Sequence, residues 1–328
     1  MRKKLSLRGI WKLLKMSFKG FSDDNILKLS GSLAYFTVFS IGPMLIIMIF
    51  FADIFYGREA IEGTVYGQIK GFVGEAAATQ IQEIIKNASL SGKSVTTAII
   101  GFIALLIGAT TVFAEIQDSI NTIWNLKPKP KKGWLKMLVN RLLSFSVVVG
   151  LGFVLLVSLI VNGLIESMMD RLQQKFPELT VIVLYILNLI ITFVITSTLF
   201  AIIFKVLPDA VIKWKDVIIG AMATSILFMI GKFAITFYIG SSDVASSYGA
   251  AGSIVVLLLW VYYSALILYF GAEFTKAYAT EYGVRIRPTH YAVWVKNVEI
   301  EEENGTLKQQ EEKKKEQNET TGDHITVT

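Results

Sequence analysis

The sequence predicts an all-α membrane protein in which six helices cross the bilayer and both termini lie in the cytoplasm. Three observations lead to this prediction. Hydrophobic residues make up 53% of the 328 residues and charged residues only 18%, with a mean hydropathy of +0.55. Six apolar stretches are each long enough for a hydrocarbon core, which takes about 20 helical residues to cross. Lysine and arginine are abundant in every second connection between these stretches, as the positive-inside rule requires.

The predicted spans are helical because their apolar runs are continuous and lack the ten-residue alternation of barrel strands. They cover residues 33–52, 95–114, 142–165, 181–204, 217–238 and 254–274. We expect a basic leader over 1–30, a six-helix domain over 31–285, and a largely disordered cytoplasmic tail over 286–328. The tail is polar and charged after residue 296.

The leader contains IWKLLKMSFKGF, where apolar residues such as Trp11, Leu14 and Phe18 recur at helical spacing with lysines between them. This pattern is typical of a basic amphipathic helix on an anionic membrane leaflet. A cluster of charges that only directs topology has the same composition. Both interpretations stay open.

Charge counts orient the spans. Eight Lys and Arg residues precede the first span, six follow the second before residue 142, and three lie in 205–216, whereas 239–253 contains none. The outer loop 53–94 has an amphipathic pattern that predicts one or two helices, packed either on the outer membrane face or over the helix bundle. The lysine-rich loop 125–134 lacks a repeated aromatic platform, so its expected partners are anionic lipid head groups rather than nucleic acid.

No catalytic motif accompanies these spans. The sequence contains no P-loop, no Gly-rich dinucleotide fingerprint, no HExxH and no GxSxG. It has no cysteine and only two histidines, His290 and His324, which excludes cysteine-ligated metals and thiolate nucleophiles. We therefore expect a protein that is not an enzyme and that uses no cofactor and no metal.

One lysine lies at membrane depth. Lys232 interrupts the apolar run ILFMIGKFAITFYIG, fifteen residues after Val217 on a helix that runs outward. A rise of about 1.5 Å per residue puts it roughly 8 Å beneath the outer boundary. Side chains lean toward the helix N-terminus, so snorkelling to the outer water works against the helix. Since a lysine at this depth costs about 2.5 to 3.5 kcal/mol, we expect it to face a polar cavity or partner, with snorkelling as the alternative.

Three other polar residues complete a candidate ligand-binding cluster. Asn188 falls at nearly the depth of Lys232, and Glu166 and Asp53 lie at outer helix ends. Whether such a cluster binds a ligand or only holds the helices together stays open. Glu273 reaches the cytoplasmic boundary, where it can pair with Lys276 one turn on.

Small residues predict where two of the spans pack. Gly220, Thr224 and Ser225 lie on the fifth span, and Ser264 and Gly271 lie on the sixth. In lipid, such residues let helix backbones approach closely. We therefore expect these faces to be helix contacts.

Three stretches are distinctive in combination: DDNILKLSGSLAYFTVFSIGPMLIIM, KVLPDAVIKWKDVIIGAMATSILF and YGAAGSIVVLLLWVYYSALILYFGAEFTKAY. Together they resemble the YihY/BrkB family of bacterial inner-membrane proteins, which has carried the old label ribonuclease BN. The ordered match covers about residues 10–285. The family-like motif positions are Asp24, Tyr35, Pro43, Pro208, Tyr248, Gly249, Trp260, Gly271 and Glu273.

The resemblance implies six spans with both ends inside and a link to envelope integrity. It favours a membrane protein that transports, scrambles or organises phospholipid or another envelope amphiphile, with Lys232 as a head-group contact. The alternative is a structural or assembly partner of an envelope protein complex. The ribonuclease label is disfavoured, because no acid-base or metal cluster lies in a soluble region.

Overall fold

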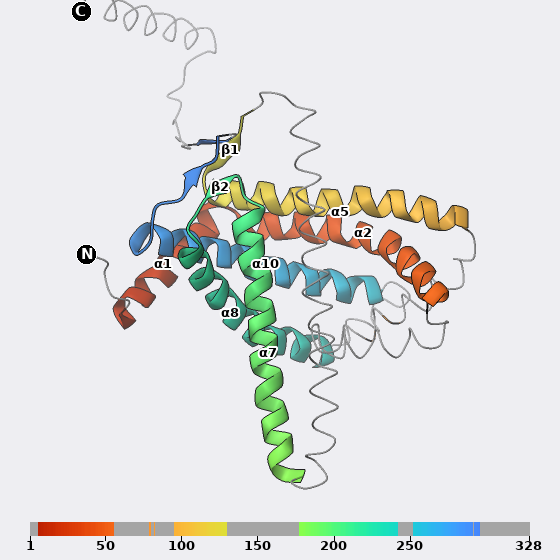
Figure 1. Ribbon diagram of the computed structural model, residues 1–328. Helices are drawn as coiled ribbons and strands as arrows, with labels where there is room; N and C mark the ends of the chain where they lie inside the picture. Colours follow the sequence, from red (N-terminus) through yellow and green to blue (C-terminus); the bar gives the residue numbers. More distant parts are fainter. Residues whose placement is uncertain are drawn as a thin grey trace, which may run out of the picture. The chain divides into compact units, whose positions relative to one another are not determined.

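The computed structural model describes residues 6–55, 79, 82, 95–129, 177–241, 252–290 and 292–295. Over these residues the chain is mostly helical, with a few very short strands (Figure 1). The expected span over 142–165 lies outside the described residues, as does most of the outer loop 53–94. The helices are α1 (Leu7–Asp23), α2 (Ile26–Phe55), α5 (Val95–Ile123), α7 (Pro177–Val206), α8 (Trp214–Ser241) and α10 (Gly252–Glu281).

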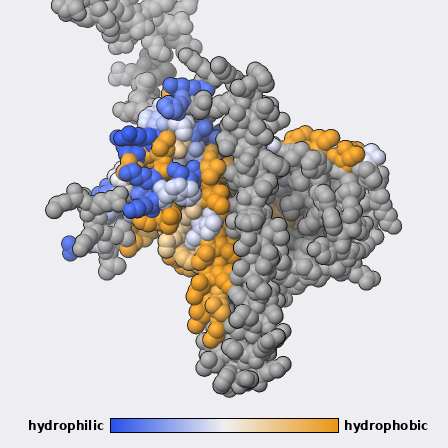
Figure 2. Space-filling model, in the orientation of Figure 1, coloured by the Kyte–Doolittle hydropathy of each residue, from blue (hydrophilic) through white to orange (hydrophobic). Residues whose placement is uncertain are grey.

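Three stretches of the described chain are long and apolar enough to cross a membrane: Ile186–Val206, Trp214–Ile239 and Ile254–Glu281. They lie within α7, α8 and α10. Helices α2 and α5 also cover the ranges expected for the first two spans. Figure 2 shows apolar surface along α7 and α5, as expected for side chains that face hydrocarbon. The full set of six spans and the cytoplasmic termini stay predictions.

Close contacts between helices use small residues. A Cβ atom on Gly271 of α10 would lie 2.8 Å from Thr224 Cβ on α8, and one on Gly220 would lie 2.8 Å from Thr275 Cβ. A threonine of the other helix therefore packs directly against each glycine. The predicted packing role of Gly220, Thr224 and Gly271 is confirmed. A Cβ on Gly108 of α5 would likewise lie 2.6 Å from the hydroxyl of Ser40 on α2.

The main core lies where α2, α5, α7, α8 and α10 meet near their ends. Its largest fully buried side chains are Trp124, Tyr269 and Phe204. Two turns lead the chain into and out of this region, at Asn25 (φ 52°) and Asn125 (φ 57°). Asparagine is one of the few residues that adopt this left-handed conformation readily. Helix α1 therefore ends sharply just before Asn25, and α5 ends sharply just before Asn125.

Two small antiparallel sheets cover this end. Strand β1 (Leu126–Pro128) pairs with β4 (Ala292–Trp294), and β2 (Ala210–Val211) pairs with β3 (Arg287–Pro288). Strands β3 and β4 lie within 286–328, the range predicted to be a largely disordered tail. They are ordered because they form backbone hydrogen bonds with β2 and β1. We call the end that holds α1 and the four strands the polar end, and Figure 2 shows hydrophilic surface there.

Candidate functional site

Two of the four residues predicted to form a ligand-binding cluster, Lys232 and Asn188, lie on α8 and α7. Lys232 is partly buried on α8, whereas Asn188 is exposed on α7 and its Oδ1 accepts a hydrogen bond from Thr192 at 3.3 Å. Asp53 lies in the last turn of α2, where only the backbone is described, and Glu166 lies outside the described residues. The cluster of four stays a prediction.

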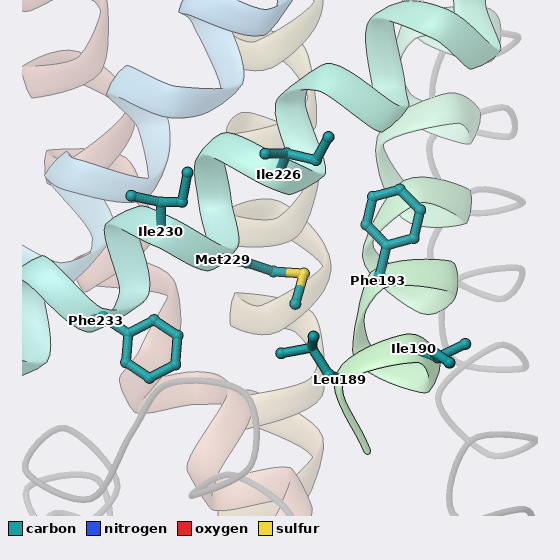
Figure 3. Close-up of a pocket in the computed structure, with 7 residues that line it drawn as sticks. All are labelled: Leu189, Ile190, Phe193, Ile226, Met229, Ile230 and Phe233. Carbon is teal, nitrogen blue, oxygen red and sulfur yellow. The ribbon is translucent and has the colours of Figure 1, made fainter. Parts of the chain in front are cut away.

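An apolar cleft of about 430 Å³ lies between α7 and α8 (Figure 3). Met229 of α8 points toward Leu189 of α7, and Phe193 lies level with Ile226. The cleft is lined by Leu189, Ile190, Phe193, Ile226, Met229, Ile230 and Phe233. All of these side chains are apolar, so the cleft offers dispersion contacts and no hydrogen bond.

The cleft opens outward rather than into the core. Phe233 and Ile230 are each 62% exposed, and Ile226 is 52% exposed. In a bilayer, these surfaces face lipid tails. Lys232 directly precedes Phe233 and Asn188 directly precedes Leu189, so each polar residue lies one position from the cleft lining. An apolar groove with polar groups beside it is complementary to an amphiphile, whose apolar tail would lie in the groove and whose polar head would lie beside it.

The second polar feature lies where α1 and α10 meet at the polar end. Lys276 Nζ lies 3.2 Å from Asp24 Oδ2 and 3.4 Å from Glu273 Oε1, which confirms the predicted pairing of Glu273 with Lys276. The side chain of Glu273 is only 3% exposed. Glu273 therefore lies inside the protein rather than in interfacial water. Sequence reasoning missed Asp24 as its neighbour because 249 residues separate the two (273 minus 24).

Helix α1 shows three faces, since helical residues are about 100° apart around the axis. Leu13 and Ser17 are fully buried on the side that packs against α10. Trp11 and Phe18 are 72% and 64% exposed on an apolar side. The basic side includes Lys12, which also reaches Glu281 of α10 at 2.7 Å. The helix predicted from the leader is thus confirmed, and its place on an anionic leaflet stays a prediction.

Two buried contacts that the sequence did not reveal hold the polar end together. The side chain of Asn121 on α5 donates to Asp209 Oδ2 at 3.1 Å and accepts from the Asp209 backbone N–H at 2.9 Å. Trp124 donates its indole N–H to the carbonyl of Ala272 at 3.0 Å. The end of α5 is thereby joined to the turn after α7 and to α10.

The remaining family-like motif positions lie in several different parts of the fold. Tyr35 is 57% exposed and its ring lies 4.8 Å from that of Phe39. Pro208 is buried in the turn before β2, and Trp260 packs edge-to-face with Phe228 at 6.1 Å. Pro43 lies in α2 with only its backbone described, and Tyr248 and Gly249 lie outside the described residues. Among the described residues, no group of three or more His, Cys, Asp or Glu side chains is placed to hold a metal ion.

These apolar helices define a multi-pass membrane protein. The family model for the virulence factor BrkB matches residues 17–293, and the chain belongs to this family. It is 27% identical over 259 residues to a UPF0761 membrane protein of Tolumonas auensis, covering 77% of this chain and 80% of that protein. It is 26% identical over 265 residues to one from Vibrio vulnificus, covering 77% and 78% respectively. The protein is therefore a multi-pass protein of the bacterial inner membrane.

A further relative, a UPF0761 membrane protein of Stenotrophomonas maltophilia strain K279a, is 26% identical over 264 residues. That match covers 79% of this chain and 59% of the relative. No solved structure matches the chain with significant similarity.

Proposed function

We propose that this protein moves or organises an envelope amphiphile, with phospholipid as the first substrate to test, within the inner membrane. The observation that carries the proposal is the cleft between α7 and α8. It is wholly apolar, it is open along exposed side chains, and its volume of about 430 Å³ falls in the range of known ligand pockets. An acyl chain matches it by both shape and polarity.

The head group of the same molecule has its own candidate contacts. Lys232 lies between the lining residues Ile230 and Phe233 on α8 and offers an ammonium group to a phosphate, and Asn188, which directly precedes Leu189 on α7, offers an amide. At the polar end, the lysines of α1 attract anionic head groups. In this account the cleft holds the tail while these groups select the head.

The test is reconstitution of the purified protein in liposomes of phosphatidylethanolamine and phosphatidylglycerol with a fluorescent phospholipid in one leaflet. We expect the wild-type protein to raise the rate at which the probe changes leaflet. Met229→Trp places a bulkier side chain in the cleft, which narrows it, and lowers this rate at least several-fold. Ile103→Trp, on the exposed face of α5 away from the cleft, is the matched control and leaves the rate unchanged.

The same assay treats Lys232 separately. Lys232→Met keeps an unbranched side chain only one atom shorter and removes the charge, so it lowers the rate if the ammonium group binds a phosphate. Equal rates for wild type, Met229→Trp and protein-free liposomes would contradict the proposal.

A second candidate is an assembly role in an envelope complex. It is favoured by an apolar ridge on α5, where Ile99, Ile100, Ile103 and Ile107 are 54% to 63% exposed. Cross-linking in cells from a residue of this ridge distinguishes the two functions. One defined protein adduct supports the assembly role, and adducts with lipid alone oppose it.

A further inference from the structure

Glu273 fills a gap between α10 and α1 that exists because residue 20 is glycine. A Cβ atom on Gly20 would lie 2.5 Å from the carboxyl carbon of Glu273 and 2.7 Å from Oε1. A side chain at residue 20 would overlap the carboxyl group of Glu273 in this position, so the glycine lets that group lie directly against the α1 backbone. With 3% exposure, it has almost no contact with water.

The charges around Glu273 do not balance. Asp24 and Glu273 share one ammonium group, that of Lys276, at 3.2 and 3.4 Å. With all three groups ionised the site has a net charge of −1, and a buried excess charge is costly. The side chains of Asp24 and Lys276 are 15% and 27% exposed, so these two groups connect Glu273 with water at the polar end.

Within the part of the chain that the structure describes, the ion pairs of Glu273 and Asp24 are those with Lys276. Helix α1 faces Glu273 with Gly20 and ends at Asp23, and Asp24 is its C-cap residue. Lys28 at the start of α2 points to the exterior. Glu115 on α5 is a further carboxylate and brings no positive charge. Among the described residues, Lys276 is therefore the cation of this site.

We propose that Glu273 is a proton-binding site that exchanges with water at the polar end through Asp24 and Lys276. A proton taken from hydronium converts the carboxylate to the neutral acid and releases water. Lys276 then pairs with Asp24 alone, and the excess charge disappears. This deepens the proposed function, on which its coupling part rests, because it makes a proton gradient the energy source for moving the amphiphile.

Proton binding is tested without any transport assay. Infrared difference spectra of the purified protein in phosphatidylglycerol nanodiscs are recorded between alkaline and acidic pH. Acidification is expected to produce the C=O band of a buried carboxylic acid in the wild type. Glu273→Gln, which keeps the shape, loses that band. Glu281→Gln is the matched control, because it removes a carboxylate of the same helix that pairs with Lys12 and not with Lys276, and it keeps the band.

Two more variants test how Asp24 and Lys276 affect proton binding by Glu273. Both keep Glu273, so they are informative even if the Glu273→Gln variant does not fold. Asp24→Asn removes a negative charge, so Lys276 pairs with Glu273 alone and stabilises its carboxylate. The pH midpoint at which the band appears therefore moves lower. Lys276→Met removes the cation and moves the midpoint to higher pH. A band that persists in Glu273→Gln, or midpoints that do not move in these opposite directions, would overturn the site.

Coupling is tested in the liposomes described above with an imposed pH difference. We expect the wild-type rate to depend on the sign of the gradient and the Glu273→Gln rate to be independent of it. Gradient-independent lipid movement by the wild type would overturn the coupling while leaving the proposed function intact. If the wild type moves no lipid, the proposed function fails, and the infrared experiment alone decides the proton site.

Discussion

The substitution Gly271→Ala tests how α8 and α10 hold together. Thr224 packs on Gly271, and its hydroxyl donates to the carbonyl of Gly220 at 2.7 Å. This bond and the β-branched side chain fix the threonine in one rotamer. A new Cβ at residue 271 would lie 2.8 Å from Thr224 Cβ, so the threonine cannot turn away and the helices must separate.

The expected cost of Gly271→Ala follows from three terms. Overpacking of a close contact costs about 1 to 3 kcal/mol. A strained or lost threonine hydrogen bond adds about 1 kcal/mol. The better helix propensity of alanine returns about 1 kcal/mol. The net loss is about 1 to 3 kcal/mol, and about 1.4 kcal/mol is tenfold in the folding equilibrium constant.

The assay is reversible unfolding in mixed micelles, followed by circular dichroism as denaturing detergent is added. Thr224→Ala in the Gly271→Ala background removes the hydroxyl and methyl groups that come nearest to the new Cβ and restores part of the stability, so the two changes couple by about 1 to 2 kcal/mol. Gly31→Ala is the matched control, because a Cβ there meets only Tyr262 at 4.0 Å. Wild-type stability for Gly271→Ala, or no rescue by Thr224→Ala, would refute this reasoning.

Three further predictions use the polar end. Trp124→Phe removes the hydrogen bond to Ala272 and some buried surface, so the same assay should show a loss of about 1 to 3 kcal/mol, and an unchanged midpoint would contradict the contact. Asn121→Ala leaves the N–H and the carboxylate of Asp209 without their partner and should cost about 2 to 4 kcal/mol; a loss below about 0.5 kcal/mol would count against it. Because the chain has no cysteine, Lys127→Cys gives a single label site, and a membrane-impermeant maleimide should reach it only after the cells are opened.

Local patterns in the sequence were sufficient for several features. The spacing of Trp11, Leu14 and Phe18 predicted α1, since helix periodicity is a local property. The pair of Glu273 and Lys276 was predicted because both residues lie on one helix, one turn apart.

The contacts that the sequence did not reveal join distant parts of the chain. Trp124 reaches Ala272, 148 residues later, and β1 pairs with β4 across a similar distance. Neither partner is marked by a local pattern. The excess charge around Glu273 was missed for the same reason, because Asp24 is brought beside it by the fold.

The cleft could not be predicted for a different reason. Helices α7 and α8 are apolar all round, so periodicity does not indicate which side of either helix faces the other. Which side chains line the gap depends on the offset and rotation of the two helices, and these follow from packing at contacts such as that of Phe200 with Phe228.

The most direct test of the central claim is photo-cross-linking of a lipid tail. Phosphatidylglycerol with a photoactivatable group near the end of one acyl chain is incorporated with the protein in liposomes, and the labelled peptides are mapped by mass spectrometry. If the cleft holds an acyl chain, labels concentrate on α7 around Leu189 and on α8 around Met229 and fall several-fold in Met229→Trp. Labels spread evenly over the exposed faces of α5, α7 and α8, and unchanged by Met229→Trp, would contradict it.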